Sequence, residues 1–143
     1  MASQRKQNHF KEARKTGGEK TLLDTSAWIE FFRGTEKGRE VKQAIESQTA
    51  YTSIITIAET TNWALKQAQN HNELIRKIKE LSIILDINEE TSKLAGEINF
   101  KRKKTIKKLG MMDSIILATA LQYNQQILTT DYDFKNIANV KII

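Results

Sequence analysis

The amino-acid sequence predicts an α/β protein with a largely parallel sheet. Short runs of apolar and β-branched residues recur along the chain, and stretches with the apolar spacing of amphipathic helices separate them. This alternation is typical of βαβ units, whose right-handed crossovers place helices on both faces of a sheet. The chain of 143 residues is 39% hydrophobic, which suits one domain with a sizeable core.

The first half of the chain is expected to hold two strands and three helices. A buried strand is expected at 20–23. The hydroxyls of Thr25 and Ser26 are expected to cap the next helix, which ends at Gly34. The elements that follow are a helix at 35–48, a strand at 51–55 and a helix at 56–69. This assignment places Glu59 in the first turn of its helix.

The second half contains a helix that should be buried on most sides. It begins at Asp113, and residues 113–120 are apolar nearly all round. Asp113 lies at the positive end of the helix dipole, where its carboxylate is either a simple N-cap or part of a site. The other expected elements are helices at 72–81 and 88–103, strands at 82–87, 126–128 and 140–143, and a turn at 133–136.

Charge and composition exclude several classes of protein. Residues 1–20 carry six basic and two acidic residues, so most of the net charge of +6 lies there. We expect residues 1–19 to form a basic, disordered arm before a domain at 20–143, either contacting phosphates or extending into solvent. The sequence has no apolar run long enough to span a membrane and no secretory signal. It has no cysteine, which excludes disulfides and is compatible with the cytoplasmic location that we expect.

Four acidic residues occupy corners where an α/β fold brings strand ends and helix starts together. Asp24 and Asp131 follow expected strands, while Glu59 and Asp113 lie in the opening turns of expected helices. Ligands of open parallel sheets bind at the carboxyl ends of the strands, so these acids should converge on one edge. Four carboxylates together repel one another unless a cation neutralises them, and their hard oxygens suit Mg²⁺ or Mn²⁺. Such metals activate water and stabilise the leaving oxygen of a phosphodiester, so the pattern predicts a metal-dependent nuclease.

The acids belong to four short segments: Leu-Leu-Asp-Thr-Ser at 22–26, Ile-Ala-Glu at 57–59, Gly-Met-Met-Asp and the apolar run after it at 110–120, and Leu-Thr-Thr-Asp-Tyr-Asp-Phe at 128–134. In this order and spacing they resemble the PIN domain, most closely the small VapC-type toxins of bacteria and archaea. The resemblance covers about residues 20–143. It implies a Rossmann-like α/β/α sandwich with a parallel five-stranded sheet, and Mg²⁺- or Mn²⁺-dependent endoribonuclease activity.

The resemblance also implies roles for individual residues. Carried over by position, the metal-binding and catalytic acids are Asp24, Glu59, Asp113 and Asp131. Asp133 lies in the same segment as Asp131, and family members differ in which acid completes the site; we prefer Asp131. Ser26 and Thr129 match polar residues that support the metal site.

Partners follow from the resemblance as well. It implies an RNA substrate, a homodimer that brings two acidic sites into one groove, and an antitoxin protein whose C-terminal segment covers that groove. A PIN nuclease of RNA processing and a catalytically inactive RNA- or protein-binding module are the alternatives. The presence of all four acids argues against the inactive module. A phosphoacceptor receiver domain is disfavoured, because Asp24 and Asp86 lack the paired acids that it needs.

Two further features bear on RNA and on assembly. Six of the eight residues at 101–108 are basic, so this run is either a solvated helix end or a clamp for RNA phosphates. The clamp would use Lys103, Lys104, Lys107 and Lys108. Large apolar residues on the helices after the first strand, and Trp63 and Leu65 on a later one, form either the core or a dimer interface. They include Trp28, Phe31, Phe32, Val41 and Ile45.

Overall fold

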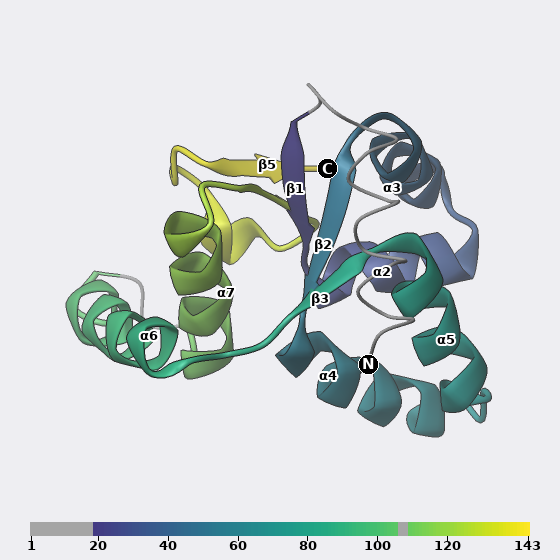
Figure 1. Ribbon diagram of the computed structural model, residues 1–143, viewed down its shortest axis with the longest axis horizontal. Coiled ribbons are helices and arrows are strands. Elements are labelled where there is room, and N and C mark those ends of the chain that lie inside the picture. Colours follow the sequence, from purple (N-terminus) through teal and green to yellow (C-terminus); the bar gives the residue numbers. More distant parts are fainter. Residues whose placement is uncertain (1–18, 106–108) are drawn as a thin grey trace, which may run out of the picture.

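A five-stranded, fully parallel sheet forms the centre of the computed structural model, which describes residues 19–105 and 109–143 (Figure 1). The strand order is β3-β2-β1-β4-β5. The strands are β1 (Lys20–Leu23), β2 (Thr49–Ser53), β3 (Ile83–Leu85), β4 (Gln126–Thr129) and β5 (Val140–Ile142). The helices are α2 (Thr25–Arg33), α3 (Glu36–Ser47), α4 (Ile54–Lys66), α5 (His71–Leu81), α6 (Glu89–Arg102), α7 (Met111–Gln122) and the short 3₁₀ helix η1 (Tyr132–Phe134). The predicted α/β/α sandwich with a parallel five-stranded sheet is confirmed.

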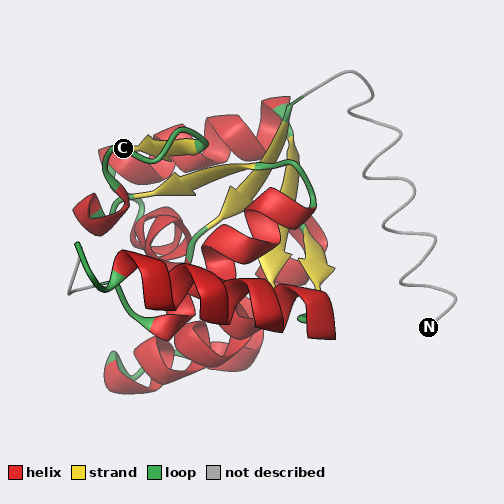
Figure 2. Ribbon diagram, turned by 90° about the vertical axis from the view of Figure 1, so that its left-hand side faces the viewer, coloured by secondary structure: helices red, strands yellow, loops and turns green. Residues whose placement is uncertain are grey.

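Alternating side chains of the sheet build two hydrophobic cores. Leu22 points to the face covered by α7, and the next residue, Leu23, points to the face covered by α2, α3 and α5. Both leucines are fully buried. Figures 1 and 2 show the helices on the two sides of the strands, with α6 packed outside α7. Because both faces are covered, the central strands β1, β2 and β4 are buried at nearly every position, whether the residue is apolar or a threonine or serine.

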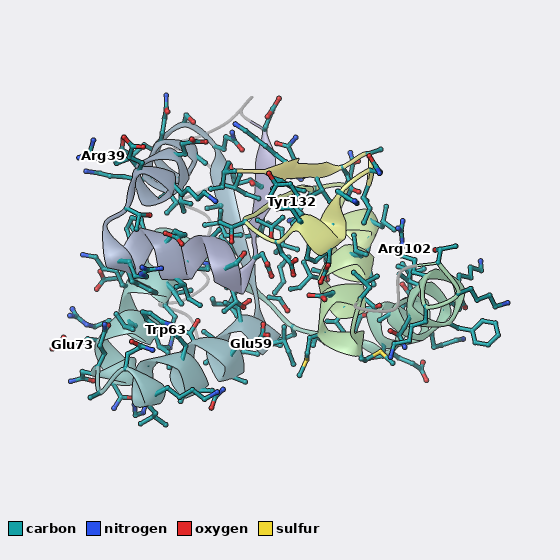
Figure 3. All side chains as sticks on the ribbon, turned by 180° about the vertical axis from the view of Figure 1, so that it is seen from behind. Arg39, Glu59, Trp63, Glu73, Arg102 and Tyr132 are labelled. Atoms are coloured by element: carbon teal, nitrogen blue, oxygen red, sulfur yellow. The ribbon has the colours of Figure 1, made fainter. Side chains whose placement is uncertain are left out.

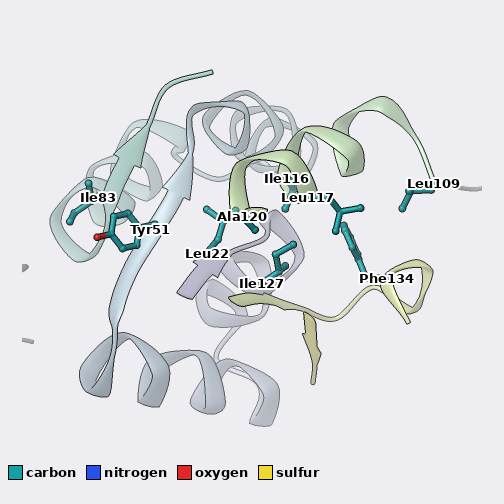
Figure 4. Close-up of a cluster of buried hydrophobic side chains, with 9 residues drawn as sticks. All are labelled: Leu22, Tyr51, Ile83, Leu109, Ile116, Leu117, Ala120, Ile127 and Phe134. Atoms are coloured by element: carbon teal, nitrogen blue, oxygen red, sulfur yellow. The ribbon is translucent and has the colours of Figure 1, made fainter. Parts of the chain in front are cut away.

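The core on the α7 side joins segments that are far apart in the sequence (Figure 4). Leu22 and Ile127 from adjacent strands meet Ile116 and Leu117 of α7, and Phe134 of η1 closes one end of the cluster. The predicted burial of α7 is correct for most of its length. Met111 and Met112 in its first turn are instead about half exposed, at 48% and 45%. The start of α7 therefore lies at the surface, and its middle lies in the core.

Two predicted boundaries are wrong in an instructive way. The chain leaves β2 at Ser53, whose hydroxyl accepts the Ile55 N–H at 3.2 Å, so Ile54 and Ile55 begin α4 and do not end the strand. Glu59 is consequently the sixth residue of α4, in its second turn and not in its first. A local serine cap thus outweighs the strand preference of two β-branched residues.

Two predicted caps are also wrong. Asp24 is the N-cap of α2, and Thr25 is the first residue of that helix. The N-cap of α7 is Gly110, which makes Asp113 the third helical residue. In both cases the helix starts earlier than the hydroxyl or carboxyl pattern suggests, which frees the Thr25 and Asp113 side chains for contacts with other elements.

Other expectations fall partly outside the described residues. Of the predicted arm at 1–19, only Glu19 lies within the described residues. Lys107 and Lys108 of the predicted RNA clamp lie outside them. The strand predicted at 82–87 is shorter, at Ile83–Leu85. None of the helices in the described ranges is both long enough and apolar enough to span a bilayer.

Candidate active site

The candidate site lies where the strand order of the sheet reverses. β1 and β4 are neighbours, yet β1 leads to β2 on one side and β4 leads to β5 on the other. In open parallel sheets, ligands bind at the carboxyl ends of the strands at such a switch point. Asp24 follows β1 directly, and its N–H donates to the Leu128 carbonyl of β4 at 3.0 Å. Asp131 comes two residues after β4. The topology therefore places these two acids at one edge of the sheet.

Two hydroxyl groups hold the Asp24 carboxylate. Ser26 Oγ and Thr129 Oγ1 both donate to Asp24 Oδ2, at 2.9 and 2.8 Å. Asp24 is only 7% exposed, and this burial raises the pKa of its carboxyl, although the bonds from Thr129 and Ser26 oppose the rise. Nearby Asp131 raises it further. Asp24 is therefore a buried acid whose charged form needs more compensation than two hydroxyls supply.

The same hydroxyls connect Asp24 to the loop after β4. Ser26 Oγ accepts the Thr130 N–H, and Thr129 Oγ1 accepts the Asp131 N–H, each at 3.0 Å. Each hydroxyl thus uses its one hydrogen on Asp24 and a lone pair on the loop backbone. Ser26 and Thr129, which the family resemblance matched to supporting residues, fix the position of Asp131 relative to Asp24.

Glu59 reaches the site from α4. Thr25 Oγ1 donates to Glu59 Oε1 at 2.6 Å, which joins the first turn of α2 to the second turn of α4. Burial raises the pKa of the Glu59 carboxyl, the Thr25 bond opposes this, and the charge of Asp24 adds to the rise. Figure 3 shows Glu59 at the end of α4 nearest α7. This role of Thr25 was not predicted from the sequence, although Thr25 directly follows Asp24.

Asp113 completes the group from the first turn of α7. Its carboxylate accepts the Gly110 N–H at 3.4 Å, a long capping bond. Burial raises the pKa of Asp113 to about 6 against the lowering effect of that bond, and the charges of Asp24, Asp131 and Glu59 raise it as well. The charges of all three other predicted acids therefore act on the Asp113 carboxyl. Asp113 is not the N-cap that the sequence allowed, but its side chain bonds to the N-cap residue from the third helical position and also lies near the other acids.

Asp133 is placed differently. Its backbone N–H donates to Asp131 Oδ1 at 2.9 Å, so Asp131 caps η1 and Asp133 lies within it. Asp133 lines a separate cavity that also includes Arg102 and Lys135. It is not among the charges that raise the pKa values of Asp24, Glu59 or Asp113. Of the two candidate acids in this segment, Asp131 is the one whose charge raises the pKa of Asp24 and of Asp113.

The charge of the group calls for a cation. Among the described residues, no lysine or arginine forms an ion pair with the four acids; the pairs there are Arg33 with Glu30 and Arg76 with Glu80. Within residues 19–105 and 109–143, no three acidic or histidine side chains are gathered closely enough to coordinate one ion as they stand. Mg²⁺, however, keeps several water ligands and binds through one or two carboxylates. A hydrated Mg²⁺ or Mn²⁺ fits this donor set of hard, uncompensated oxygens.

The predicted RNA clamp is only partly within the described chain. Lys103 is the C-cap of α6 and is exposed, and Lys104 Nζ lies 4.5 Å from the ring centroid of Phe100. Phe100 is itself 68% exposed, so this lysine lies along the outside of α6.

Trp28, in contrast, is fully buried and donates from Nε1 to Thr52 Oγ1 at 3.0 Å. It belongs to the core, as the packing interpretation required.

Comparison with solved structures places the fold among toxin–antitoxin proteins. A toxin–antitoxin complex from Klebsiella pneumoniae is 29% identical with a TM-score of 0.67, over 85% of this chain and 95% of that one. VapBC-1 from nontypeable Haemophilus influenzae is 26% identical with a TM-score of 0.65, over 87% and 96%. The Mycobacterium tuberculosis toxin VapC20, described as cleaving the sarcin-ricin loop, is 15% identical with a TM-score of 0.69, over 85% and 98%, a likeness of fold alone.

Comparison of the sequence with known families and proteins gives one clear match. No curated protein sequence matches the chain. The PIN domain family matches residues 21–140, a range that contains the four acids and the strands from Thr21 of β1 to Val140, the first residue of β5. Because this match spans most of the chain, the protein belongs to the PIN domain family.

Proposed function

We propose that this protein is a Mg²⁺- or Mn²⁺-dependent endoribonuclease and the toxin of a VapBC-type toxin–antitoxin pair. The observation that carries the proposal is that Asp24, Glu59 and Asp131 lie near enough to Asp113 to raise the pKa of its carboxyl. The four acids come from four separate elements, and three of them raise the pKa of the fourth. Buried carboxylates with no cationic partner among the described residues are costly unless they bind a cation.

Each side chain has a distinct part in the proposed chemistry. One or two of the carboxylates of Asp24, Glu59, Asp113 and Asp131 would bind the hydrated cation directly, and the others would face its water ligands. Ser26, Thr129 and Thr25 fix the orientation of Asp24 and Glu59. When bound, the divalent cation activates water and stabilises the leaving oxygen of a phosphodiester. The four acids repel RNA phosphates when no cation is bound, so a bound metal should strengthen RNA binding at the site.

The toxin assignment rests on the solved relatives. The 29%-identical structure is a toxin–antitoxin complex, and the 26%-identical one is a VapBC pair. By analogy the partners of this chain are an RNA substrate, an antitoxin protein and a second copy of the chain. An apolar-walled cavity of 350 Å³ between α2 and α5 offers a contact surface for an antitoxin segment, and is lined by Phe31, Phe32, Glu73, Leu74, Arg76 and Lys77. This assignment implies a cytoplasmic location, where cellular RNA and such partners occur.

The decisive experiment combines cleavage with metal binding. Purified protein, stripped with EDTA, is incubated with RNA alone and with added Mg²⁺ or Mn²⁺, and its thermal unfolding is followed in the same buffers. We expect cleavage only with metal, and a higher Tm with metal because only the folded state gathers the acids. Asp24→Asn and Asp113→Asn should lower cleavage by at least about 100-fold and remove most of the shift in Tm.

The matched control is Glu46→Gln. Glu46 is exposed near the end of α3, which leads into the amino end of β2 at the opposite edge of the sheet. This variant should cleave RNA and respond to metal like the parent. RNA cleavage by Asp113→Asn at the parental rate would refute the assignment of the site. Metal-independent RNA binding without cleavage would instead identify an inactive PIN module.

A further inference from the structure

A second site lies beside the acidic group, in a cavity of 310 Å³ between the end of α6 and the η1 segment. Its lining residues are Arg102, Thr105, Tyr132, Asp133, Lys135 and Asn136. The volume is at the lower end of the range of about 300–1,000 Å³ that small-ligand pockets occupy. The cavity therefore suits one flat ring and its charged substituent, and is too small for a folded segment of protein.

Tyr132 gives this cavity an aromatic wall. It is 72% exposed, whereas Phe134, two residues later, is fully buried in the α7-side core. The turn between them is fixed, because Asp131 caps it through the Asp133 N–H and the Lys135 N–H donates to the Tyr132 carbonyl at 3.0 Å. A solvent-facing ring on a fixed backbone turn is available to stack on a nucleobase.

The same cavity carries unpaired positive charge. Neither Arg102 nor Lys135 forms an ion pair within the described residues, although Asp133 lines the cavity with them. Arg102 ends α6, and its carbonyl accepts the Thr105 N–H at 3.0 Å and the Thr105 hydroxyl at 3.2 Å, which fixes the backbone there. Two cations beside an exposed ring match a phosphate attached to a base.

Asn136 supplies hydrogen-bonding groups at the rim. Its φ of 65° is in the left-handed region, which asparagine tolerates better than most residues. Its amide is both donor and acceptor, the combination that reads the edge of an unpaired base. Figure 3 shows Tyr132 and Arg102 in the same half of the molecule, with Arg39 and Glu73 at the opposite side.

A chain of hydrogen bonds joins the wall of this cavity to the acidic group. Asp24 is bonded to Thr129, Thr129 to the Asp131 N–H, and the Asp131 carboxylate to the Asp133 N–H. Asp133 is in turn part of the cavity wall. We infer that this cavity binds one unpaired nucleotide of the RNA next to the scissile phosphate, with its base on Tyr132 and its phosphate at Arg102 and Lys135. This inference rests on the proposed ribonuclease function, because it names how that substrate is held.

The test measures RNA binding apart from cleavage. Fluorescently labelled single-stranded 12-mers of A, C or U are titrated in EDTA, and the affinity is read by anisotropy at several salt concentrations. Tyr132→Ala should weaken binding roughly 5- to 100-fold, since one stacked base is lost, and Tyr132→Phe should restore it. Arg102→Ala should weaken binding and reduce the salt slope by about 0.7, as one lost phosphate contact predicts.

Matched controls come from the same residue types elsewhere. Tyr123→Ala removes a tyrosine that is 36% exposed at the far end of α7, and Arg39→Ala removes an exposed arginine of α3. If the Tyr132 and Arg102 variants bind RNA as these controls do while the parent still cleaves RNA with metal, the nucleotide site is wrong and the proposed function stands. If poly-glutamate displaces RNA from the parent and not from Tyr132→Ala, the cavity is a protein-docking site, which overturns the inference.

A second measurement covers the case in which the nucleotide site exists but the proposed ribonuclease function fails. Adenosine and uridine 5′-monophosphates are titrated into the parent and Tyr132→Ala, and binding is followed by NMR. If the parent binds a nucleotide through Tyr132 but cleaves no RNA with Mg²⁺ or Mn²⁺, the nucleotide site holds and the proposed function fails. If the parent binds neither RNA nor nucleotide, both are wrong.

Discussion

Asp113 illustrates at the residue scale how a carboxyl group can serve a site and weaken the fold. Its pKa in the folded protein is about 6, raised from 3.8 chiefly by burial and also by the three neighbouring acids. A group with a raised folded pKa contributes stability that is fully present below its unfolded pKa and is lost as pH rises through its folded pKa. The loss for Asp113 therefore falls between about pH 4 and pH 6.

The upward shift of the Asp113 pKa gives a prediction for the metal-free protein. Its Tm, measured by circular dichroism in EDTA, should rise as pH falls from 7 to 5. Asp113→Asn should be the more stable protein at pH 7 and should show a flatter pH dependence, because Asn carries no charge to bury. Adding Mn²⁺ at pH 7 should raise the Tm of the parent more than that of the variant. A parent and variant with the same pH slope would show that the group is not electrostatically coupled.

The individual acids were predictable from sequence, whereas their supporting contacts were only partly so. Asp24 and Asp131 follow strands, and parallel strands end at one edge, so their proximity follows from the pattern alone. The Thr25–Glu59 bond depends on how α2 and α4 pack, which no local pattern contains. The exposure of Tyr132 could not be predicted either, because the exposure of an aromatic residue is a property of the folded surface.

At the scale of elements, the pairing of α2 with α3 depends on one glycine. A Cβ on Gly38 would lie 2.3 Å from the Glu30 carbonyl oxygen, which is backbone and cannot move aside like a side chain. The connection is equally tight, since Gly34 ends α2 at φ 69° and Thr35 caps α3 by accepting the Gly38 N–H at 3.0 Å. The two helices approach closely because Gly38 has no side chain.

Two glycine-to-alanine changes test this close approach. Gly38→Ala should lower the free energy of unfolding by about 1–3 kcal/mol, because the new methyl group overpacks two backbones. Gly96→Ala is the matched control in α6, where nothing lies within 4 Å of the added Cβ, and it should raise that free energy by about 0.4–1 kcal/mol. Urea unfolding of both variants measures the difference. Equal effects would mean that α2 and α3 adjust to the extra atom.

The order and type of the elements followed from the sequence, but some boundaries did not. Apolar periodicity located all five strands and the helices between them, since that pattern reflects burial on both faces of the sheet. The β2–α4 junction was misplaced because Ile54 and Ile55 favour strands locally, while the Ser53 cap and the packing of α4 decide their conformation. Boundaries of this kind are set by single hydrogen bonds.

At the scale of the whole molecule, the exposed face of α4 bears on assembly. Ile54 and Leu65 are 39% and 62% exposed, and Ala58 between them is exposed as well, so one face of the helix presents apolar side chains to solvent. Trp28, Val41 and Ile45, which the sequence left open as interface or core, are in the core. The apolar surface left exposed to solvent is therefore smaller than the sequence suggested, and it includes this face of α4.

We expect this face to lie in a homodimer. Sedimentation at micromolar concentration should give about twice the chain mass of 16.4 kDa, and Leu65→Glu should shift the protein toward the single-chain mass, because a charge in an apolar two-fold contact is repeated on both sides. Lys66→Glu is a control for charge on the same helix turn. A parent that sediments near 16 kDa at tens of micromolar would exclude the dimer.

The pairing of β1 with β4 also governs when activity can first arise during synthesis. Thr129, whose hydroxyl holds Asp24, lies 105 positions after it in the chain. During synthesis Asp24 and Glu59 are therefore made well before β4, the strand that completes the carboxyl edge, and Asp113 is made shortly before it. A nascent chain carries most of the acids but lacks the central neighbour of β1. We therefore expect the proposed ribonuclease to become active only after β4 has paired with β1.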